Sequence, residues 1–322
     1  MKTLCIGLSL TPTQQSEIWS SSYTRLVSDS SGLSRRALFG QGLFRLVEGI
    51  DDRQPTPAPD PVATVDPARY ALRQLEAWNA SHGMRLWAQA SSELLEAATC
   101  DPCARTLDAG AGDGSLALLA AQRGAAPTAC DTAAALVARG RARAAAAGVH
   151  VDWLEADMAA LPFGAGFFDC ALSAFAPMFC LQPRAAIGEL FRVTRPGGTV
   201  AFTTWTVGGI VGRLLRLAAE HDPPPAGVPR PLTWGREEQL RTELELHTDR
   251  ADLTHGTLTM RFATREDAAD RLLRALGPLA AASHDATFRP RALAIVDELA
   301  QDADDHHVCL PARYLVAVAQ CP

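Results

Sequence analysis

The sequence predicts an α/β protein built on a doubly wound, mostly parallel sheet. Three observations support this fold class. Short apolar segments alternate with amphipathic ones between about residues 105 and 221, a glycine-rich turn follows the first apolar segment, and a proline-rich stretch precedes the whole pattern. Strand–helix–strand alternation places ligand sites at the carboxyl ends of parallel strands. With 322 residues, 48% of them hydrophobic, the chain can bury such a core.

The individual elements follow from hydrophobic periodicity. Strands are expected at about 105–109, 126–130, 150–155, 168–173 and 198–205, with another within 244–262 and a last one at 314–319. Helices are expected at about 68–79, 83–98, 114–123, 132–147, 184–193, 208–221, 264–276 and 288–303. Seven strands in this alternation describe a Rossmann-like sheet.

Residues 51–67 contain five prolines and no hydrophobic period, which is typical of a linker. We therefore divide the chain into an N-terminal arm with its linker, 1–66, and one α/β domain, 67–322. The arm carries a short amphipathic helix that could cover the active site, join two subunits in a homodimer, or form a loosely held tail. A helical cap is expected from segments at about 67–98, 206–243 and 264–305.

Composition excludes several classes of partner. The net charge of −6 and the lack of a long basic block argue against a nucleic-acid partner. The sequence has no run of 18 or more apolar residues, so we do not expect a membrane span. The eight cysteines are scattered, which favours a reducing, cytoplasmic location. Cys100 and Cys103 form a CxxC pair without a second pair to complete a metal site, so we expect a loop with two thiols and no metal.

The glycine-rich turn holds the most informative motif. It reads Asp108-Ala109-Gly110, with further glycines at 112 and 114. Alternate glycines allow a ligand to approach bare backbone, although they also suit a plain tight turn. The spacing GxGxG differs from the GxGxxG of dinucleotide-binding loops. Asp108 would repel a pyrophosphate, whereas it suits the cationic amino group and sulfonium of S-adenosylmethionine.

Two further strand ends carry acids. The second strand leads into Asp131-Thr132, where a carboxylate can accept both ribose hydroxyls of a nucleoside. The third leads into Asp157-Met158, where the acid can accept from an adenine amino group and the thioether can pack on the ring. Either aspartate could instead cap a helix. In register with the glycine turn, they favour an adenosine cofactor.

The stretch from about 68 to 320 resembles the ubiquinone-biosynthesis-like class I S-adenosylmethionine-dependent methyltransferases. The resemblance rests on LDAGAGDG, ACD, EADMAALPFGAGFFDCALS and ELFRVTRPGGTVAFTTW, and a bacterial small-molecule subgroup shares the PPPAGVP loop. It implies cofactor-binding roles for Asp108, Ala109, Gly110, Gly112, Gly114, Asp131, Thr132, Asp157, Met158, Ser173 and Phe175. Ser173 and Phe175 would line the methionine side. The chain departs from the subgroup at Ala176, Gln182 and His82-Gly83, all on the substrate side.

Methyl transfer to oxygen needs a base, and a histidine suits that role. We predict His82 as that base, ahead of His221, which fits a helix end, and His247, expected in a late strand. The predicted substrate pocket consists of Trp78, Met178, Phe179, Trp205 and Trp234, each of which could equally be core.

The sequence thus predicts methyl transfer to an O or C nucleophile of a small, hydrophobic or aromatic metabolite, with S-adenosylhomocysteine as product. The alternative is an S-adenosylmethionine-binding protein that does not methylate, acting in a cyclisation or decarboxylation or structurally. A nicotinamide-dependent reductase and an RNA or protein methyltransferase fit the motifs less well. In particular, the chain has neither a Tyr-x-x-x-Lys pair nor an asparagine-proline-proline-aromatic motif after the fourth strand.

Overall fold

The computed structural model describes residues 67–322 except 82–83, 102 and 305–306. These residues belong to one compact unit that starts at Val65. The arm and linker, 1–66, lie outside the described residues, so their predicted helix and the homodimer through them stay predictions. His82 also lies outside the described residues.

Within the described residues, the sheet has eight strands in the order β3-β2-β1-β4-β5-β8-β6, and β7 pairs with β8. The first five strands of this path pair in parallel, whereas β8 runs antiparallel to both β5 and β6. This confirms the doubly wound, Rossmann-like sheet; seven strands form its path and the short β7 adds an eighth. The strands are β1 (Arg105–Ala109), β2 (Ala126–Asp131), β3 (Asp152–Glu155), β4 (Phe168–Ala174), β5 (Thr194–Trp205), β6 (Ala251–Phe262), β7 (Gln301–Asp304) and β8 (His307–Gln320).

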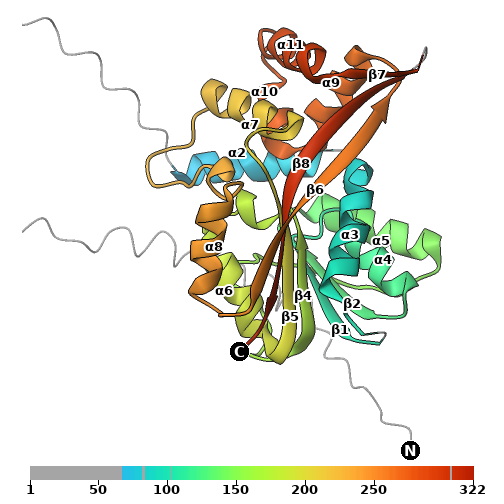
Figure 1. Cartoon of the computed structure of the whole chain (residues 1–322), viewed down its shortest axis with the longest axis vertical. Coiled ribbons are helices and arrows are strands. Elements are labelled where there is room, and N and C mark those ends of the chain that lie inside the picture. Colours follow the sequence, from blue (N-terminus) through green and yellow to red (C-terminus); the bar gives the residue numbers. More distant parts are fainter. Residues whose placement is uncertain (1–66, 82–83, 102, 305–306) are drawn as a thin grey trace, which may run out of the picture. The chain divides into compact units, whose positions relative to one another are not determined.

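Helices cover both faces of the sheet (Figure 1). One face carries α3, α4 and α5, and the other carries α6 and α8. Helices α4 and α5 connect strands that lie on one side of β1, whereas α6 connects strands on the other side, so right-handed crossovers place them on opposite faces. The α-helices are α2 (Pro67–Ala80), α3 (Ala88–Ala98), α4 (Ser115–Gln122), α5 (Ala134–Ala147), α6 (Pro183–Val193), α7 (Ile210–His221), α8 (Glu237–Glu245), α9 (Arg265–Ala275), α10 (Gly277–Ala282) and α11 (Phe288–Leu299), and the 3-10 turns are η2 (Met84–Trp87), η3 (Pro177–Phe179) and η4 (Pro231–Thr233).

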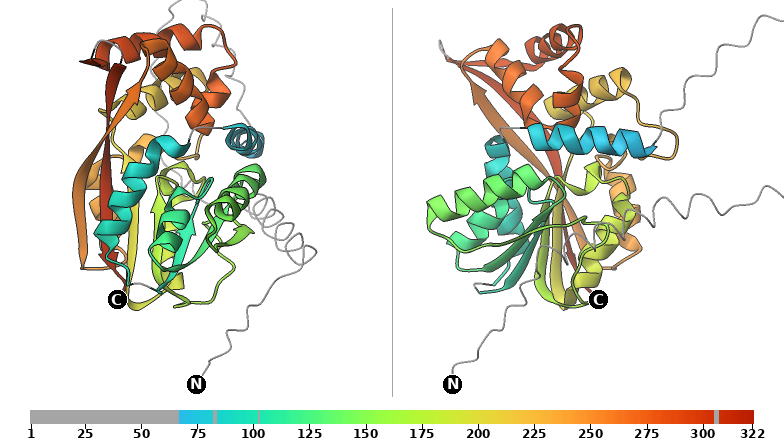
Figure 2. Two further views of the ribbon diagram at one scale, coloured as in Figure 1. Left: turned by 90° about the vertical axis from the view of Figure 1, so that its right-hand side faces the viewer. Right: turned by 180° about the vertical axis from the view of Figure 1, so that it is seen from behind.

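The cap stands on two long strands. β6 and β8 extend past the parallel sheet and carry α9, α10 and α11 at their far ends, with α7 packed beneath them (Figure 2). Helix α2 lies between these cap helices and the sheet, in contact with α10 on one side and α5 on the other. Of the predicted cap segment 67–98, only α2 lies there, because α3 packs against β4 and β5.

Two predicted boundaries and the placement of His247 are wrong in the C-terminal third. The helix expected at 288–303 ends at Leu299, and the polar stretch after it forms β7, whose backbone pairs with an extended β8. The strand β8 starts at His307 and is therefore longer than the predicted 314–319. His247 lies in the turn after α8, a helix whose acidic first turn and buried Leu240 and Leu244 fit the 3.6-residue period.

Cysteine pairing also differs from the prediction. Cys100 and Cys170 form a disulfide with a Cα–Cα distance of 6.4 Å, whereas Cys103 is exposed and free. The expectation of two free thiols is therefore wrong for Cys100. The two partners are 70 residues apart and meet because Cys100 follows α3, which packs against β4, the strand that contains Cys170; residue spacing does not reveal this.

None of the helices in the described part of the chain is both long and apolar enough to cross a membrane. Over the same residues, no cluster of three His, Cys, Asp or Glu side chains is arranged to hold a metal ion.

Candidate cofactor and substrate site

The glycine turn between β1 and α4 is built from left-handed backbone. Gly110, Gly112 and Gly114 have φ of 68°, 57° and 83°, where a side chain costs about 1–2 kcal/mol of strain. The Ala111 amide donates to the carbonyl of Cys130 at the end of β2, at 2.9 Å. The turn is thereby fixed against the neighbouring strand, and its backbone faces the carboxyl edge of the sheet.

Close packing is a second reason why two of these positions require glycine. A Cβ on Gly110 would overlap the Cβ of Ala176, and a Cβ on Gly114 would overlap the indole of Trp153. The first contact joins the turn after β1 to the segment after β4. Ala176, the departure from the subgroup noted in the sequence, is therefore part of the wall of the glycine turn.

Asp108 is buried behind the turn, with 1% of its surface exposed. Its Oδ2 accepts from the Ala117 amide of α4 at 2.9 Å, while its Oδ1 has no hydrogen-bond partner. Burial, opposed by the Ala117 hydrogen bond and assisted by the nearby carboxylates of Asp131 and Asp113, raises the pKa of Asp108 to about 7. A buried carboxyl with one free oxygen is costly, and a cationic ligand group would relieve that cost.

Asp131 clamps the same turn from the end of β2. Its two oxygens accept from the Gly112 and Ala133 amides, both at 2.8 Å. Each carboxylate oxygen keeps a second lone pair, so these bonds leave acceptor capacity for a ligand hydroxyl. Burial raises the pKa of Asp131, and the backbone hydrogen bonds and the Arg139 guanidinium oppose the shift. Thr132 follows as a half-buried residue.

The predicted adenine residues lie on opposite sides of their backbone. Met158 is buried, and its sulfur lies next to Gly110, 3.5 Å from the place a Cβ would take. Asp157 is exposed, and its Oδ1 accepts from the Ala159 amide at 2.9 Å. The structure thus brings Met158 to the glycine turn and leaves Asp157 exposed.

The end of β4 and the residue after it are fixed by three contacts. The Ser173 hydroxyl donates to the carbonyl of Ala109 at 2.6 Å. Phe175 has a φ of 65°, and its amide donates to the Thr203 hydroxyl at 3.0 Å. Its ring stacks on Trp205 with a centroid separation of 3.7 Å. The Phe175 ring therefore packs in the core, and it is the next residue, Ala176, that contacts the glycine turn.

The predicted substrate residues divide into wall and core. Trp78 and Phe179 are half-buried and meet edge to face, with centroids 5.2 Å apart. The Trp78 indole lies on Gly277 of α10, where a Cβ would overlap it. By contrast, three of the five are core residues that expose 5% or less: Met178, Trp205 and Trp234.

The described histidines considered as bases have other partners. His221 ends α7, as expected, and its Nε2 lies 3.5 Å from a carboxylate oxygen of Asp285. His247 stacks on Phe191 with centroids 4.7 Å apart. Neither contact involves the glycine turn. The role predicted for His82 stays a prediction.

Sequence reasoning missed two arginines of α5. Arg143 forms an ion pair with Asp113 at 2.5 Å and donates to the Asp113 carbonyl at 2.9 Å, so it holds the tip of the glycine turn. Arg139 donates to two carbonyls at the end of α2. The available signal was the spacing of four residues, which places both on one face of an alanine-rich helix.

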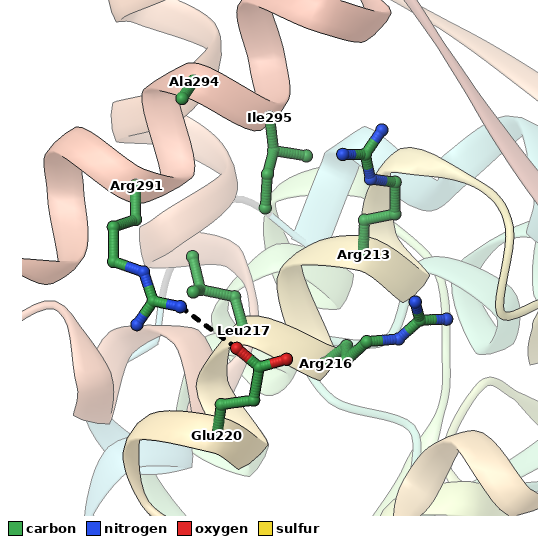
Figure 3. A pocket seen from close by; sticks show the side chains of 7 residues that line it. All are labelled: Arg213, Arg216, Leu217, Glu220, Arg291, Ala294 and Ile295. Carbon is green, nitrogen blue, oxygen red and sulfur yellow. Dashed lines mark hydrogen bonds and ion pairs between the residues drawn. The ribbon is translucent and has the colours of Figure 1, made fainter.

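A separate cleft of about 360 Å³ lies between α7 and α11 (Figure 3). Arg291 pairs with Glu220 inside it at 3.0 Å, and Arg213 pairs with Glu298 at 2.6 Å. Most of its charge is therefore matched, and it contains no residue of the glycine turn. It is lined by Arg213, Arg216, Leu217, Glu220, Arg291, Ala294 and Ile295.

Comparison with known proteins gives a consistent picture. Residues 107–202 match a family model described as a methyltransferase domain. An uncharacterized protein of Mycobacterium tuberculosis is 34% identical over 221 residues, covering 67% of this chain and 81% of that protein. The malonyl-[acyl-carrier protein] O-methyltransferase of Salmonella typhimurium is 41% identical over 117 residues, covering 36% and 45%.

Solved structures share the fold. A candidate methyltransferase from Bacillus halodurans has a TM-score of 0.52 at 16% identity and covers 73% of this chain and 99% of its own. The YcgJ protein of Bacillus subtilis has a TM-score of 0.51 at 15% identity, with the same coverage. At these identities the likeness concerns the fold alone.

Proposed function

Because the chain belongs to the class I S-adenosylmethionine-dependent methyltransferases, we propose that it methylates an O or C nucleophile of a small, hydrophobic or aromatic metabolite. S-adenosylmethionine is its cofactor. The finer part of the proposal, the class of acceptor, rests on the residues that surround the glycine turn.

The residues present fit the cofactor. The unpartnered, buried Oδ1 of Asp108 suits a cationic methionine end, and the bare backbone of Gly110 and Gly112 allows close approach. Asp131 would hold the ribose hydroxyls with its remaining lone pairs, and Met158 would contact the adenine. When bound, the cofactor supplies an electrophilic methyl group on a sulfonium.

The contact between Trp78 and Phe179 carries the proposal for the acceptor. Two half-buried rings from α2 and η3 meet beside the carboxyl edge of the sheet. They form an apolar wall between the cap and the cofactor residues. Such a wall favours a hydrophobic or aromatic acceptor and excludes water from it.

The residues of the chain act mainly by positioning. The Ser173 and Thr203 hydrogen bonds hold the segment after β4 rigid against the glycine turn. When the acceptor and the methyl donor are already held in place, little translational and rotational freedom remains to be lost in the reaction. This lowers the barrier and can supply much of the rate. An oxygen nucleophile also gives up a proton, and we propose His82 as the base that accepts it.

A second function is favoured by Ala176. Its methyl group fills the space beside Gly110, where the related subgroup usually has glycine, so it changes the methionine side of the site. The alternative is an S-adenosylmethionine-binding enzyme that does not methylate, and it differs in one observable respect. It would bind the cofactor without forming S-adenosylhomocysteine.

The test starts with calorimetric titration of the purified chain with S-adenosylmethionine, S-adenosylhomocysteine and NADPH. Micromolar binding of the first two and none of the third supports the proposal, and binding of NADPH alone would contradict it. Aromatic and polyketide acceptors are then screened for S-adenosylhomocysteine release. Cofactor binding together with substrate conversion that releases no S-adenosylhomocysteine would favour the alternative.

A further inference from the structure

Helix α5 begins without a cap of its own. Its N-cap residue is Ala133, which has no side-chain acceptor, so the first-turn amides need partners from elsewhere. Asp131 accepts from the Ala133 amide at 2.8 Å. The Ala135 amide donates to the Oδ1 of Asn79, 56 residues upstream in α2, at 2.9 Å. Helix α2 therefore supplies the cap that α5 lacks.

The end of α2 is satisfied in return by α5. Arg139 donates to the carbonyl of Ser81 at 2.8 Å and to that of Asn79 at 3.3 Å. The Asn79 carbonyl lies in the last turn of α2 and the Ser81 carbonyl just after it, where an intrahelical donor is missing and a cation is favourable. Burial raises the pKa of Asp131, and the charge of the same guanidinium opposes that rise, so Arg139 lies close enough to act on the proposed ribose ligand.

Helix α2 is also tied to the cap. Arg73 donates two hydrogen bonds to Asp222 after α7, at 3.0 and 3.2 Å. Trp78 lies on Gly277 of α10. One helix thus bridges two regions: Arg73 and Trp78 contact the cap, and Asn79 contacts the start of α5, shortly after Asp131.

We propose that Asn79 and Arg139 form a latch that holds α2 over the ribose end of the cofactor site and sets the rate at which the cofactor leaves. They are positioning residues, because they act through α2 and α5 rather than on the reacting atoms. The proposal rests on the proposed placement of the ribose at Asp131. Opening the latch breaks the hydrogen bond of one α5 amide and those of two carbonyls at the end of α2 together. The latch therefore opposes the movement of α2 that would let the cofactor leave.

The experiment measures S-adenosylhomocysteine dissociation by stopped-flow tryptophan fluorescence, with excess S-adenosylmethionine as competitor. Asn79→Ala should raise the dissociation rate about 3- to 10-fold, the effect of one hydrogen bond lost at a closed site. Arg139→Ala should raise it further. Asn79→Asp keeps an acceptor for the Ala135 amide and should return the rate to within about twofold of the unmodified chain.

Arg73→Ala is the matched control, since it removes two hydrogen bonds that join the same helix to Asp222 rather than to α5. The latch predicts little change in the dissociation rate for this variant. Equal acceleration by Arg73→Ala and Asn79→Ala would show that α2 is merely packed, and an unchanged rate in Asn79→Ala would also overturn the latch. If Asn79→Ala does not fold, Asn79→Ser tests the same bond, because its shorter side chain does not reach the amide.

Failure of the latch and failure of the proposed function give different results. If the unmodified chain does not bind S-adenosylhomocysteine, the proposed site is wrong. If the unmodified chain binds S-adenosylhomocysteine but the variants release it at the same rate as the unmodified chain, the site stands and the latch is wrong.

Discussion

The cofactor region and the cap of this protein are held together differently. Around the glycine turn, backbone amides and carboxylates interact over short stretches of chain, as in the 2.8 Å bond from the Gly112 amide to Asp131. In the cap, α2 meets α10 and α7 through contacts such as Arg73 with Asp222, 149 residues away. The first region repeats a pattern set by local backbone geometry, whereas the second depends on surfaces that meet only in the folded chain.

This difference separates cofactor binding from acceptor recognition. Changes at the glycine turn should affect S-adenosylmethionine affinity whatever the acceptor. Changes at the wall formed by Trp78 and Phe179 should affect turnover of the acceptor and leave cofactor affinity nearly intact. The four experiments below test that separation.

The largest effect is expected from Gly110→Ala. A φ of 68° strains alanine by about 1–2 kcal/mol, and the added Cβ would displace Ala176 as well. We expect S-adenosylmethionine affinity to fall on the order of 100-fold by calorimetry. Gly148→Ala is the matched control, because Gly148 has a φ of 66° and nothing within 4 Å of an added Cβ. It should lose stability only; equal loss of affinity in both variants would contradict the role of the Ala176 contact.

The second effect is a pH dependence of stability caused by Asp108. Burial raises its pKa from 3.8 to about 7 in the folded protein. Between these values the folded protein binds more protons than the unfolded chain, so its free energy of unfolding falls as the pH rises and levels off above about 7. At about 1.4 kcal/mol per pH unit, the contribution of Asp108 over this whole range is on the order of 4 kcal/mol.

Urea unfolding of the ligand-free protein at pH 5, 6, 7 and 8 measures this slope. Asp108→Asn carries no charge and should lack it, so the difference between the two proteins isolates Asp108 from the other carboxylates. Parallel curves for the two proteins would show that the carboxyl titrates normally.

The third effect concerns Asp131. Replacing it with alanine removes acceptors for Gly112 and Ala133 as well as the proposed ribose contact. We expect S-adenosylmethionine binding to weaken by about 1–3 kcal/mol in calorimetric titration. An unchanged affinity would refute the placement of the ribose at the end of β2.

The smallest effect tests the cap. Trp78→Ala removes half of the apolar wall, and we expect kcat/KM for the acceptor to fall about tenfold, as for the loss of a partly buried contact. S-adenosylmethionine affinity should stay within about twofold. Leu72→Ala, on the exposed side of the same helix with 49% of its surface accessible, should change neither. A joint loss of turnover and cofactor affinity in Trp78→Ala would break the proposed separation of the two regions.

The accuracy of prediction from the sequence also differs between the parallel sheet, which carries the cofactor region, and the C-terminal third, which includes most of the cap. The strands from β1 to β5 and the helices between them agree with expectation within a few residues, apart from the N-terminal extension of β5 to Thr194, because each is a short periodic segment between clear breaks. The errors lie in the C-terminal third, where Gln301–Asp304 pairs with β8 instead of continuing a helix. Pairing with a strand later in the chain is a long-range interaction that local periodicity does not contain.

The sequence by itself determined the fold class, the glycine turn and the acids at the strand ends. Glycines indicate where the backbone takes a left-handed conformation, and the period of apolar residues indicates which segments are buried strands or helices. Only the tertiary structure decided which side chains meet. It placed Trp205 and Met178 in the core, paired Cys100 with Cys170, and joined Asn79 to α5. Such contacts depend on the packing of surfaces distant in the chain, and that packing is settled only when the whole domain has folded.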